Sequence, residues 1–98
     1  MYCDINKDEL TSKMSENLRV LRNKLRLKQS DLAKKVGISR QTLLEIENGK
    51  RTMQWSIFLA LLSVFREDSG TRDLIEHFGI YTPELGKYLV SPDNTSAD

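Results

Sequence analysis

Hydrophobic residues recur along the chain with the three- and four-residue spacing of an amphipathic helix, and no alternating run is long enough to form a convincing strand. The spacing predicts helices over six segments, namely 15–27, 29–36, 39–48, 54–65, 72–78 and 83–90. Residues 6–14 are expected to add a helical turn before the first of them. Ser15 and Ser39 suit the N-cap position, because a serine hydroxyl can accept a free backbone N–H. We therefore expect an all-α fold, a compact bundle of five or six short helices.

Glycines and polar stretches mark the expected boundaries of these helices. Gly37 and Gly49 each follow a helical segment and suit the left-handed conformation that ends a helix. The stretch REDSGT, residues 66–71, is typical of a polar loop. Residues 91–98 contain nothing to bury, so we expect a disordered tail after a single domain over residues 1–90.

The segment from Trp55 to Phe65 is unusually apolar. Nine of its eleven residues are hydrophobic, and a helix that is apolar all round must be covered on more than one side. Two interpretations stay open at this point. The segment is either only the central core helix of the bundle, or its small-residue face, formed by Ser56, Ala60 and Ser63, also meets another subunit.

The charge of the chain is unevenly distributed. Residues 13–51 hold eleven Lys and Arg against four Asp and Glu, a net charge of +7, whereas residues 1–12 sum to −2 and residues 52–98 to −4. A basic segment between acidic flanks is typical of a face that meets a polyanion. Ordinary solvated helix surface would explain it equally well, so charge alone does not decide the function.

The sequence argues against an enzyme. It has one His and one Cys, and it lacks the metal-binding His-Glu-x-x-His motif and the glycine-rich nucleotide-binding motifs. Cys3 is expected in a frayed N-terminus, and His77 as a packing or surface residue. A single cysteine allows no internal disulfide, as is common in the cytoplasm, and the longest apolar run, IFLALL, is too short to span a membrane. We expect a cytoplasmic protein with no cofactor, metal, membrane or small-molecule substrate.

Residues 29–48, QSDLAKKVGISRQTLLEIEN, form two short predicted helices joined by a glycine turn, the pattern of a helix-turn-helix. This stretch resembles the lambda-repressor and Cro-like family, the XRE-like regulators. The matching close-approach, turn and buried positions are Ala33, Gly37, Ile38, Leu43 and Ile46. The wider resemblance runs over residues 15–65, or as far as 78. It implies a lambda-repressor-like fold and sequence-specific binding to double-stranded DNA.

The resemblance also implies roles for individual residues. The residues that match base-reading positions in the major groove are Arg40, Gln41 and Glu45. Those that match phosphate-binding positions are Gln29, Asn48, Lys50 and Arg51. Arg22 and Glu47 match a pair that forms a salt bridge between the first and third helices.

The chemistry of the base-reading positions agrees with these roles, with alternatives left open. Arg can donate twice to guanine and Gln can pair with adenine, while Glu accepts from cytosine. Glu45 could instead only orient Gln41, four residues earlier on the helix, and Arg40 could contact a phosphate. Leu44 is expected to be exposed on the same face, where a thymine-methyl contact and idle surface are equally plausible.

Two positions depart from the family pattern. Lys28 stands where a Thr or Ser often caps the first helix of the motif, and its ammonium group cannot accept a backbone N–H. Either that cap is weakened or Ser30 supplies it with a shifted start, and Lys28 could point at phosphate. Met53 and Gln54 stand where Pro-Ser often begins the fourth helix.

We expect a transcriptional regulator, a repressor that binds a palindromic operator as a homodimer, because helix-turn-helix operators are usually read by two-fold dimers. Residues 71–90 are the expected dimerisation segment. The alternative is an antitoxin that binds its own promoter and a toxin protein.

Overall fold

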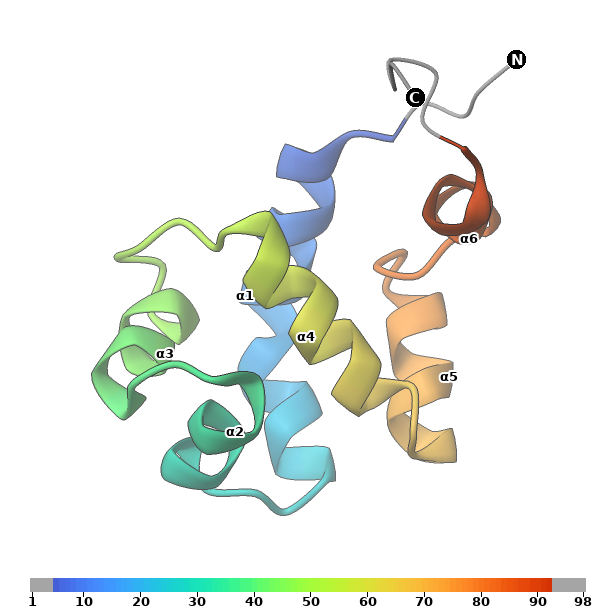
Figure 1. Ribbon diagram of the computed structural model, residues 1–98. Helices are drawn as coiled ribbons and strands as arrows, with labels where there is room; N and C mark the ends of the chain where they lie inside the picture. Colours follow the sequence, from blue (N-terminus) through green and yellow to red (C-terminus); the bar gives the residue numbers. More distant parts are fainter. Residues whose placement is uncertain (1–4, 93–98) are drawn as a thin grey trace.

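The computed structural model describes residues 5–92 of the 98-residue chain. This part of the chain is all-α and contains six helices and no strand, which confirms the predicted fold class (Figure 1). The helices are α1 (Lys7–Lys24), α2 (Gln29–Val36), α3 (Arg40–Glu47), α4 (Trp55–Phe65), α5 (Ser69–His77) and α6 (Pro83–Val90). Cys3 and most of the expected tail, residues 93–98, lie outside the described residues.

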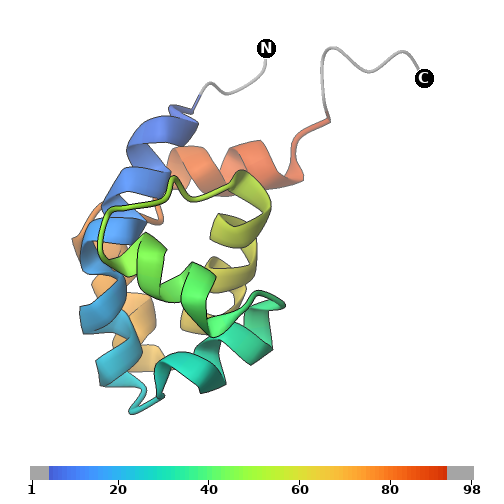
Figure 2. The ribbon, with the colours of Figure 1, turned by 90° about the vertical axis from the view of Figure 1, so that its left-hand side faces the viewer.

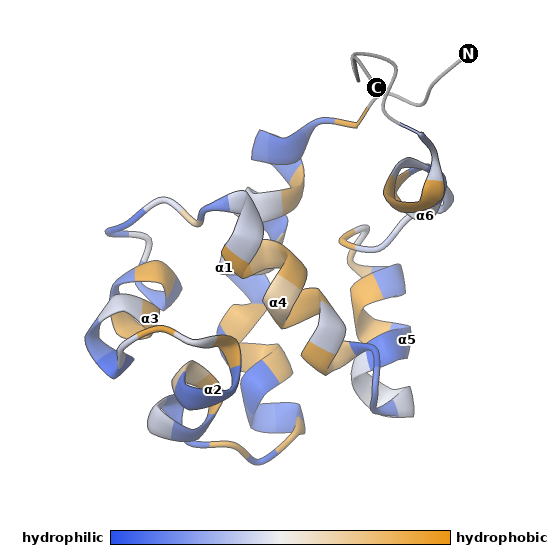
Figure 3. Cartoon of the chain, in the orientation of Figure 1, coloured by the Kyte–Doolittle hydropathy of each residue, from blue (hydrophilic) through white to orange (hydrophobic). Residues whose placement is uncertain are grey.

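Two layers of helices flank the pair formed by α1 and α4. α2 and α3 lie on one side of this pair and α5 and α6 on the other, as the two views at right angles show (Figures 1 and 2). The apolar faces of the helices turn inward (Figure 3). The largest fully buried side chains are Met14, Leu18, Leu21, Leu32, Leu43, Ile46, Phe58, Leu61, Phe65, Ile75, Ile80 and Leu85. No helix among the described residues is both long and apolar enough to cross a bilayer.

α1 is longer than the sequence analysis expected. It begins at Lys7, after Asn6, whose side-chain oxygen accepts the backbone N–H of Glu9 at 3.0 Å. The prediction of Ser15 as an N-cap was therefore wrong. Ser15 lies inside α1, and its hydroxyl donates to the backbone carbonyl of Ile46 in α3 at 2.7 Å. A contact between distant segments, not a helix start, explains this serine.

The two glycine turns and the start of α3 follow the prediction. Gly37 and Gly49 have φ angles of 80° and 74°, which side chains with a Cβ rarely adopt. The hydroxyl of Ser39 accepts the backbone N–H of Thr42 at 3.0 Å and caps α3. Ile38, expected to be buried, is only partly so.

The polar stretch 66–71 is only partly a loop. α5 begins at Ser69, because Asp68 caps it by accepting the backbone N–H of Thr71 at 3.1 Å. The hydroxyl of Thr71 is buried and donates to the carbonyl of Phe65 at 2.6 Å. This buried hydrogen bond joins the end of α4 to the start of α5 and makes the turn tight.

α6 packs on the N-terminal ends of α1 and α4 through aromatic contacts. The ring of Trp55 stacks on Phe58 with centroids 4.7 Å apart and meets Tyr88 edge-on at 6.4 Å. The ammonium group of Lys7 lies 5.2 Å from the Trp55 ring. Such aromatic and cation–π contacts add to the burial of apolar surface.

Candidate nucleic-acid interface

α3 exposes one face because its opposite face is buried. Leu43 and Ile46 are fully buried, and α2 packs against α3. At 100° per residue, Gln41, Leu44 and Glu45 then point outward. Gln41 is exposed, and Leu44 and Glu45 are partly exposed. The structure therefore brings three of the four predicted base-reading residues together on one helical face.

The outward face of α3 is internally hydrogen-bonded. The side-chain amide of Gln41 donates to Glu45 at 3.2 Å, and the guanidinium group of Arg51 reaches the other carboxylate oxygen of Glu45 at 2.7 Å. The hydrogen bonds from Gln41 and then Arg51 lower the pKa of Glu45. Glu45 is thus charged at neutral pH and orients both neighbours in the protein without DNA.

Behind α3, the buried carboxylate of Glu47 holds the first three helices together. Arg22 donates to it from Nε at 2.7 Å and from Nη2 at 3.2 Å, and Gln29 donates its side-chain N–H at 3.1 Å. The third donor of Arg22, Nη1, reaches the carbonyl of Leu27 at 2.9 Å. The structure therefore joins Arg22 to Glu47, as the resemblance implies. It also turns the side chain of Gln29 inward, where it donates to Glu47.

α2 begins at Gln29, without the shift to Ser30 that the sequence left open. Its N-cap is Lys28, whose side chain makes no capping hydrogen bond within the described residues. The backbone N–H of Lys28 instead donates to Asp31 at 3.3 Å. The first turn of α2 therefore offers backbone N–H groups to an external anion, next to the exposed Lys28.

The loop after α3 carries the remaining predicted phosphate-binding residues. Asn48 is the C-cap of α3, and Lys50 and Arg51 follow Gly49; all of these residues are exposed. The backbone N–H of Lys50 donates to the carbonyl of Glu45 at 2.8 Å, so this turn is held against α3.

Sequence reasoning missed Arg19 of α1. Its Nη2 donates to Oδ1 of Asn48 at 3.0 Å, and its Nε lies 3.8 Å from Glu47. The side chain of Arg19 is 60% exposed, against 12% for Arg22. A usable signal was its spacing: Arg19 precedes Arg22 by three residues and so lies on the same face of α1.

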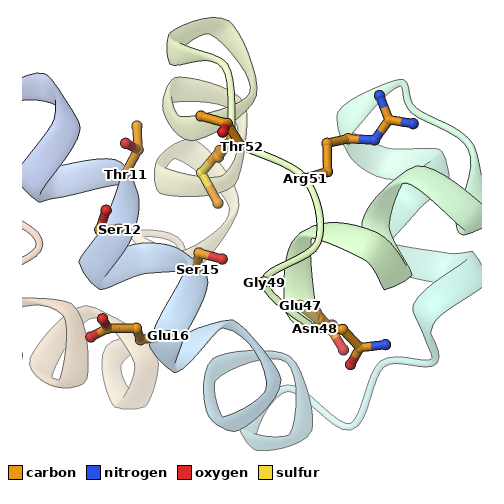
Figure 4. Close-up of a pocket in the computed structure, with 10 residues that line it drawn as sticks. Thr11, Ser12, Ser15, Glu16, Glu47, Asn48, Gly49, Arg51 and Thr52 are labelled. Carbon is orange, nitrogen blue, oxygen red and sulfur yellow. The ribbon is translucent and has the colours of Figure 1, made fainter.

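Two hollows adjoin this surface and differ in charge. The first, which we call the basic hollow, is an open depression of about 540 Å³ between α1, α2 and the start of α3. Its described lining residues are Arg19, Arg22, Lys28, Gln29, Ser30 and Arg40. The second, of about 410 Å³, lies between α1 and the loop after α3 (Figure 4). Its lining residues include Glu16 and Glu47, of which Glu47 has a buried side chain. Figure 4 shows the side chain of Arg51 pointing away from α1.

One comparison with known proteins gave a match. A family model described as a helix-turn-helix domain matches residues 14–78, well over half of the chain, and this range includes α2, α3 and α4. A search of curated proteins found no match. The matched range contains α2, the glycine turn and α3, together with the exposed cations Lys28, Lys50 and Arg51. The chain therefore belongs to the helix-turn-helix domain family and carries a DNA-binding domain.

Proposed function

We propose that the protein is a transcriptional regulator that recognises specific sequences of double-stranded DNA, with α3 in the major groove. The arrangement around α3 carries this proposal. Its outward face bears side chains that suit base edges, and both of its ends lie beside exposed cations that suit phosphates. A single α-helix fits the width of the major groove.

We assign base reading to Arg40, Gln41, Leu44 and Glu45. Arg40 is the exposed first residue of α3, and a guanidinium group can donate twice to guanine. Gln41 and Glu45 are already hydrogen-bonded to each other, so they would approach adjacent base pairs as a unit. Leu44 lies beside them and can contact a thymine methyl group.

We assign phosphate binding to Lys28, Gln29, Asn48, Lys50 and Arg51. Because the side-chain amide of Gln29 donates within the protein, its backbone N–H in the first turn of α2 is the group that we expect to meet phosphate. Lys28 and Lys50 supply exposed point charges. Arg51 would exchange its carboxylate partner on α3 for a phosphate oxygen.

We further propose that two copies bind a palindromic operator and repress transcription by occluding polymerase. Helix-turn-helix dimers place their half-sites about 34 Å apart, one turn of DNA. Residues 71–90 and the outer face of α4 are the proposed contact. In this region Val90 is 84% exposed, Leu89 is also exposed, and Ser56 and Ser63 form a small-residue surface on α4. Exposed apolar residues in neighbouring positions favour a protein partner.

The same exposed apolar residues support a second candidate function, that of an antitoxin. In that case Val90 and Leu89 would contact a toxin protein, and the DNA-binding surface would bind the promoter of the pair. Copurification of a second polypeptide from the native source distinguishes the two.

Selection of bound sequences from random duplex DNA tests the main proposal. We expect enrichment of an inverted repeat whose half-site centres lie about 34 Å apart. The protein should bind the enriched duplex at least about a thousandfold more tightly than a scrambled one, the lower end of the range for specific binders. Equal binding of both duplexes would contradict sequence-specific recognition.

A further inference from the structure

We infer that Arg19 binds a backbone phosphate of the DNA. This phosphate lies over the basic hollow between α1, α2 and α3. This inference rests on the proposed function, because the phosphate belongs to bound DNA. It assigns a contact to α1, a helix outside the helix-turn-helix unit.

Among the described residues, Arg19 has no carboxylate of its own and shares that of Glu47 with Arg22. Glu47 is the carboxylate nearest to it, at 3.8 Å, but that carboxylate already accepts two hydrogen bonds from Arg22 at 2.7 and 3.2 Å. One carboxylate therefore lies beside two guanidinium groups. Since Arg22 uses Nε, Nη1 and Nη2 inside the protein, Arg19 is the cation of this cluster that can serve an external anion.

The exposure of Arg19 allows it to change partner. Its side chain is 60% exposed and makes a hydrogen bond to Asn48, which is also exposed. Hydrogen bonds between exposed groups are worth little, because water competes for both partners. A phosphate oxygen, which is charged, is a stronger acceptor for the guanidinium group than an amide oxygen.

The basic hollow has the charge that an anion requires. Four of its six described lining residues are cations, and the one carboxylate found within 4 Å of these cations among the described residues, that of the buried Glu47, offsets only one of the four charges. The hollow between α1 and the loop after α3 differs, since beside the buried Glu47 its charged lining residues are Glu16 and Arg51, and Arg51 is paired with Glu45. The uncapped first turn of α2, at Gln29 and Ser30, adds backbone N–H groups to the basic hollow. Of the two hollows, the basic one therefore suits a phosphate.

Arg19 also determines which group Asn48 presents to the DNA. Because Arg19 donates to Oδ1 of Asn48, the amide Nδ2 of Asn48 is turned away from that contact and is available as a donor. Figure 4 shows the side chain of Asn48 pointing away from Ser12 and Ser15 of α1. Arg19 and Asn48 thus present donors side by side at the edge of α3.

The test compares Arg19→Ala with Lys24→Ala. Lys24 is an exposed cation on the same helix, but its side chain lies next to Gly70 of α5, on the other side of the molecule. Affinity is measured for the selected duplex and for a scrambled duplex at about 50 and about 200 mM salt. Loss of a charge-assisted hydrogen bond should weaken Arg19→Ala about tenfold on both duplexes at the lower salt concentration.

Salt dependence identifies the phosphate contact. Arg19→Ala should lower the slope of log affinity against log salt by about 0.9. Its loss of affinity relative to the wild type should therefore be about threefold smaller at the higher salt concentration than at the lower one. Arg19→Lys should keep the wild-type slope because it keeps the charge, and Lys24→Ala should match the wild type. Melting temperatures of all variants should agree, since both positions are exposed.

The inference is overturned if Arg19→Ala binds DNA as tightly as Lys24→Ala does. It is also overturned if Arg19→Lys loses as much DNA affinity as Arg19→Ala. The second result would mean that Arg19 acts only by positioning Asn48. If the wild type binds neither duplex, the proposed function fails, whatever the Arg19 variants do.

Discussion

Arg22 of α1 and Glu47 of α3 are joined by two parallel hydrogen bonds of 2.7 and 3.2 Å, and the side chain of Glu47 is fully buried. This pair ties the proposed DNA-reading helix to the first helix of the bundle. Gln29 of α2 donates to the same carboxylate, so one buried charge is shared by three helices. The orientation of α3 depends on this cluster.

Removal of one partner of this pair should destabilise the protein. Glu47→Ala leaves the guanidinium group of Arg22 buried and unpaired, which typically costs about 3 kcal/mol or more. We therefore expect a lower melting temperature for Glu47→Ala. The double variant Arg22→Met with Glu47→Ala should recover part of the loss, because it also removes the orphaned charge. Thermal denaturation measures both, and a Glu47→Ala protein as stable as the wild type would contradict the prediction.

The hydrogen bond between the hydroxyl of Ser15 and the carbonyl of Ile46 should also contribute to stability. Ser12→Ala is the matched control, because Ser12 lies on the same helix and is exposed. Both changes raise helix propensity equally. The difference between the free energies of unfolding of the two variants therefore isolates the contribution of the hydrogen bond. We expect Ser15→Ala to be less stable than Ser12→Ala by about 1 kcal/mol in denaturant unfolding. Equal stability would mean that water replaces the hydroxyl.

The charge of Glu45 should depend on its two neighbours. The hydrogen bonds from Gln41 and Arg51 hold its pKa below the ordinary value, so their stabilising effect is present at neutral pH and is lost as the pH falls through that lowered pKa. Gln41→Ala and Arg51→Ala should each raise the pKa of Glu45. NMR titration of the Glu45 carboxyl carbon measures this, and Lys34→Ala serves as a distant control. An unchanged pKa in both variants would rule out the contacts in solution.

Variants of Arg40 and Lys50 should distinguish base reading from phosphate binding, because loss of the two kinds of contact affects DNA affinity differently. Loss of a bidentate base contact costs about 1–3 kcal/mol and relaxes preference at one base pair in each half-site. Arg40→Ala should therefore reduce the ratio of the affinity for operator DNA to the affinity for scrambled DNA. Lys50→Ala should weaken both duplexes alike and lower the salt slope by about 0.9. If Arg40→Ala also weakens both equally, Arg40 binds phosphate, in keeping with its position at the edge of the basic hollow.

Assembly should depend on the exposed end of α6. Light scattering should report a dimer for the wild type and a monomer for Val90→Asp, because a buried charge disfavours an apolar contact. Val20→Asp is the matched control, since Val20 is 51% exposed but lies on α1. A wild-type monomer both free and on DNA would exclude the proposed dimer, and dissociation by Val20→Asp alone would move the interface to α1.

Local chemistry along the chain was enough to predict much of the fold. The Ser39 cap of α3 and the left-handed turns at Gly37 and Gly49 follow from interactions within a few residues, and each can be predicted from the sequence. α4 ends at Phe65, as predicted, because charged residues follow its apolar run, and it begins at Trp55, one residue after the predicted start. The resemblance of residues 29–48 to a known motif predicted which residues of α3 face outward.

Contacts between distant residues decided the rest. Asn6 and Ser15 are both suitable caps by local chemistry, and α1 continues through Ser15 because Leu10 and Met14 are buried in the core. The pairing of Arg19 with Asn48 joins residues 29 positions apart, and no periodicity predicts it. Local sequence determined where helices can begin and end, since caps and turns act over one helical turn. Only the packed structure determined which polar side chains share a buried carboxylate and which cation is left for DNA, because those partners meet only when the helices pack together.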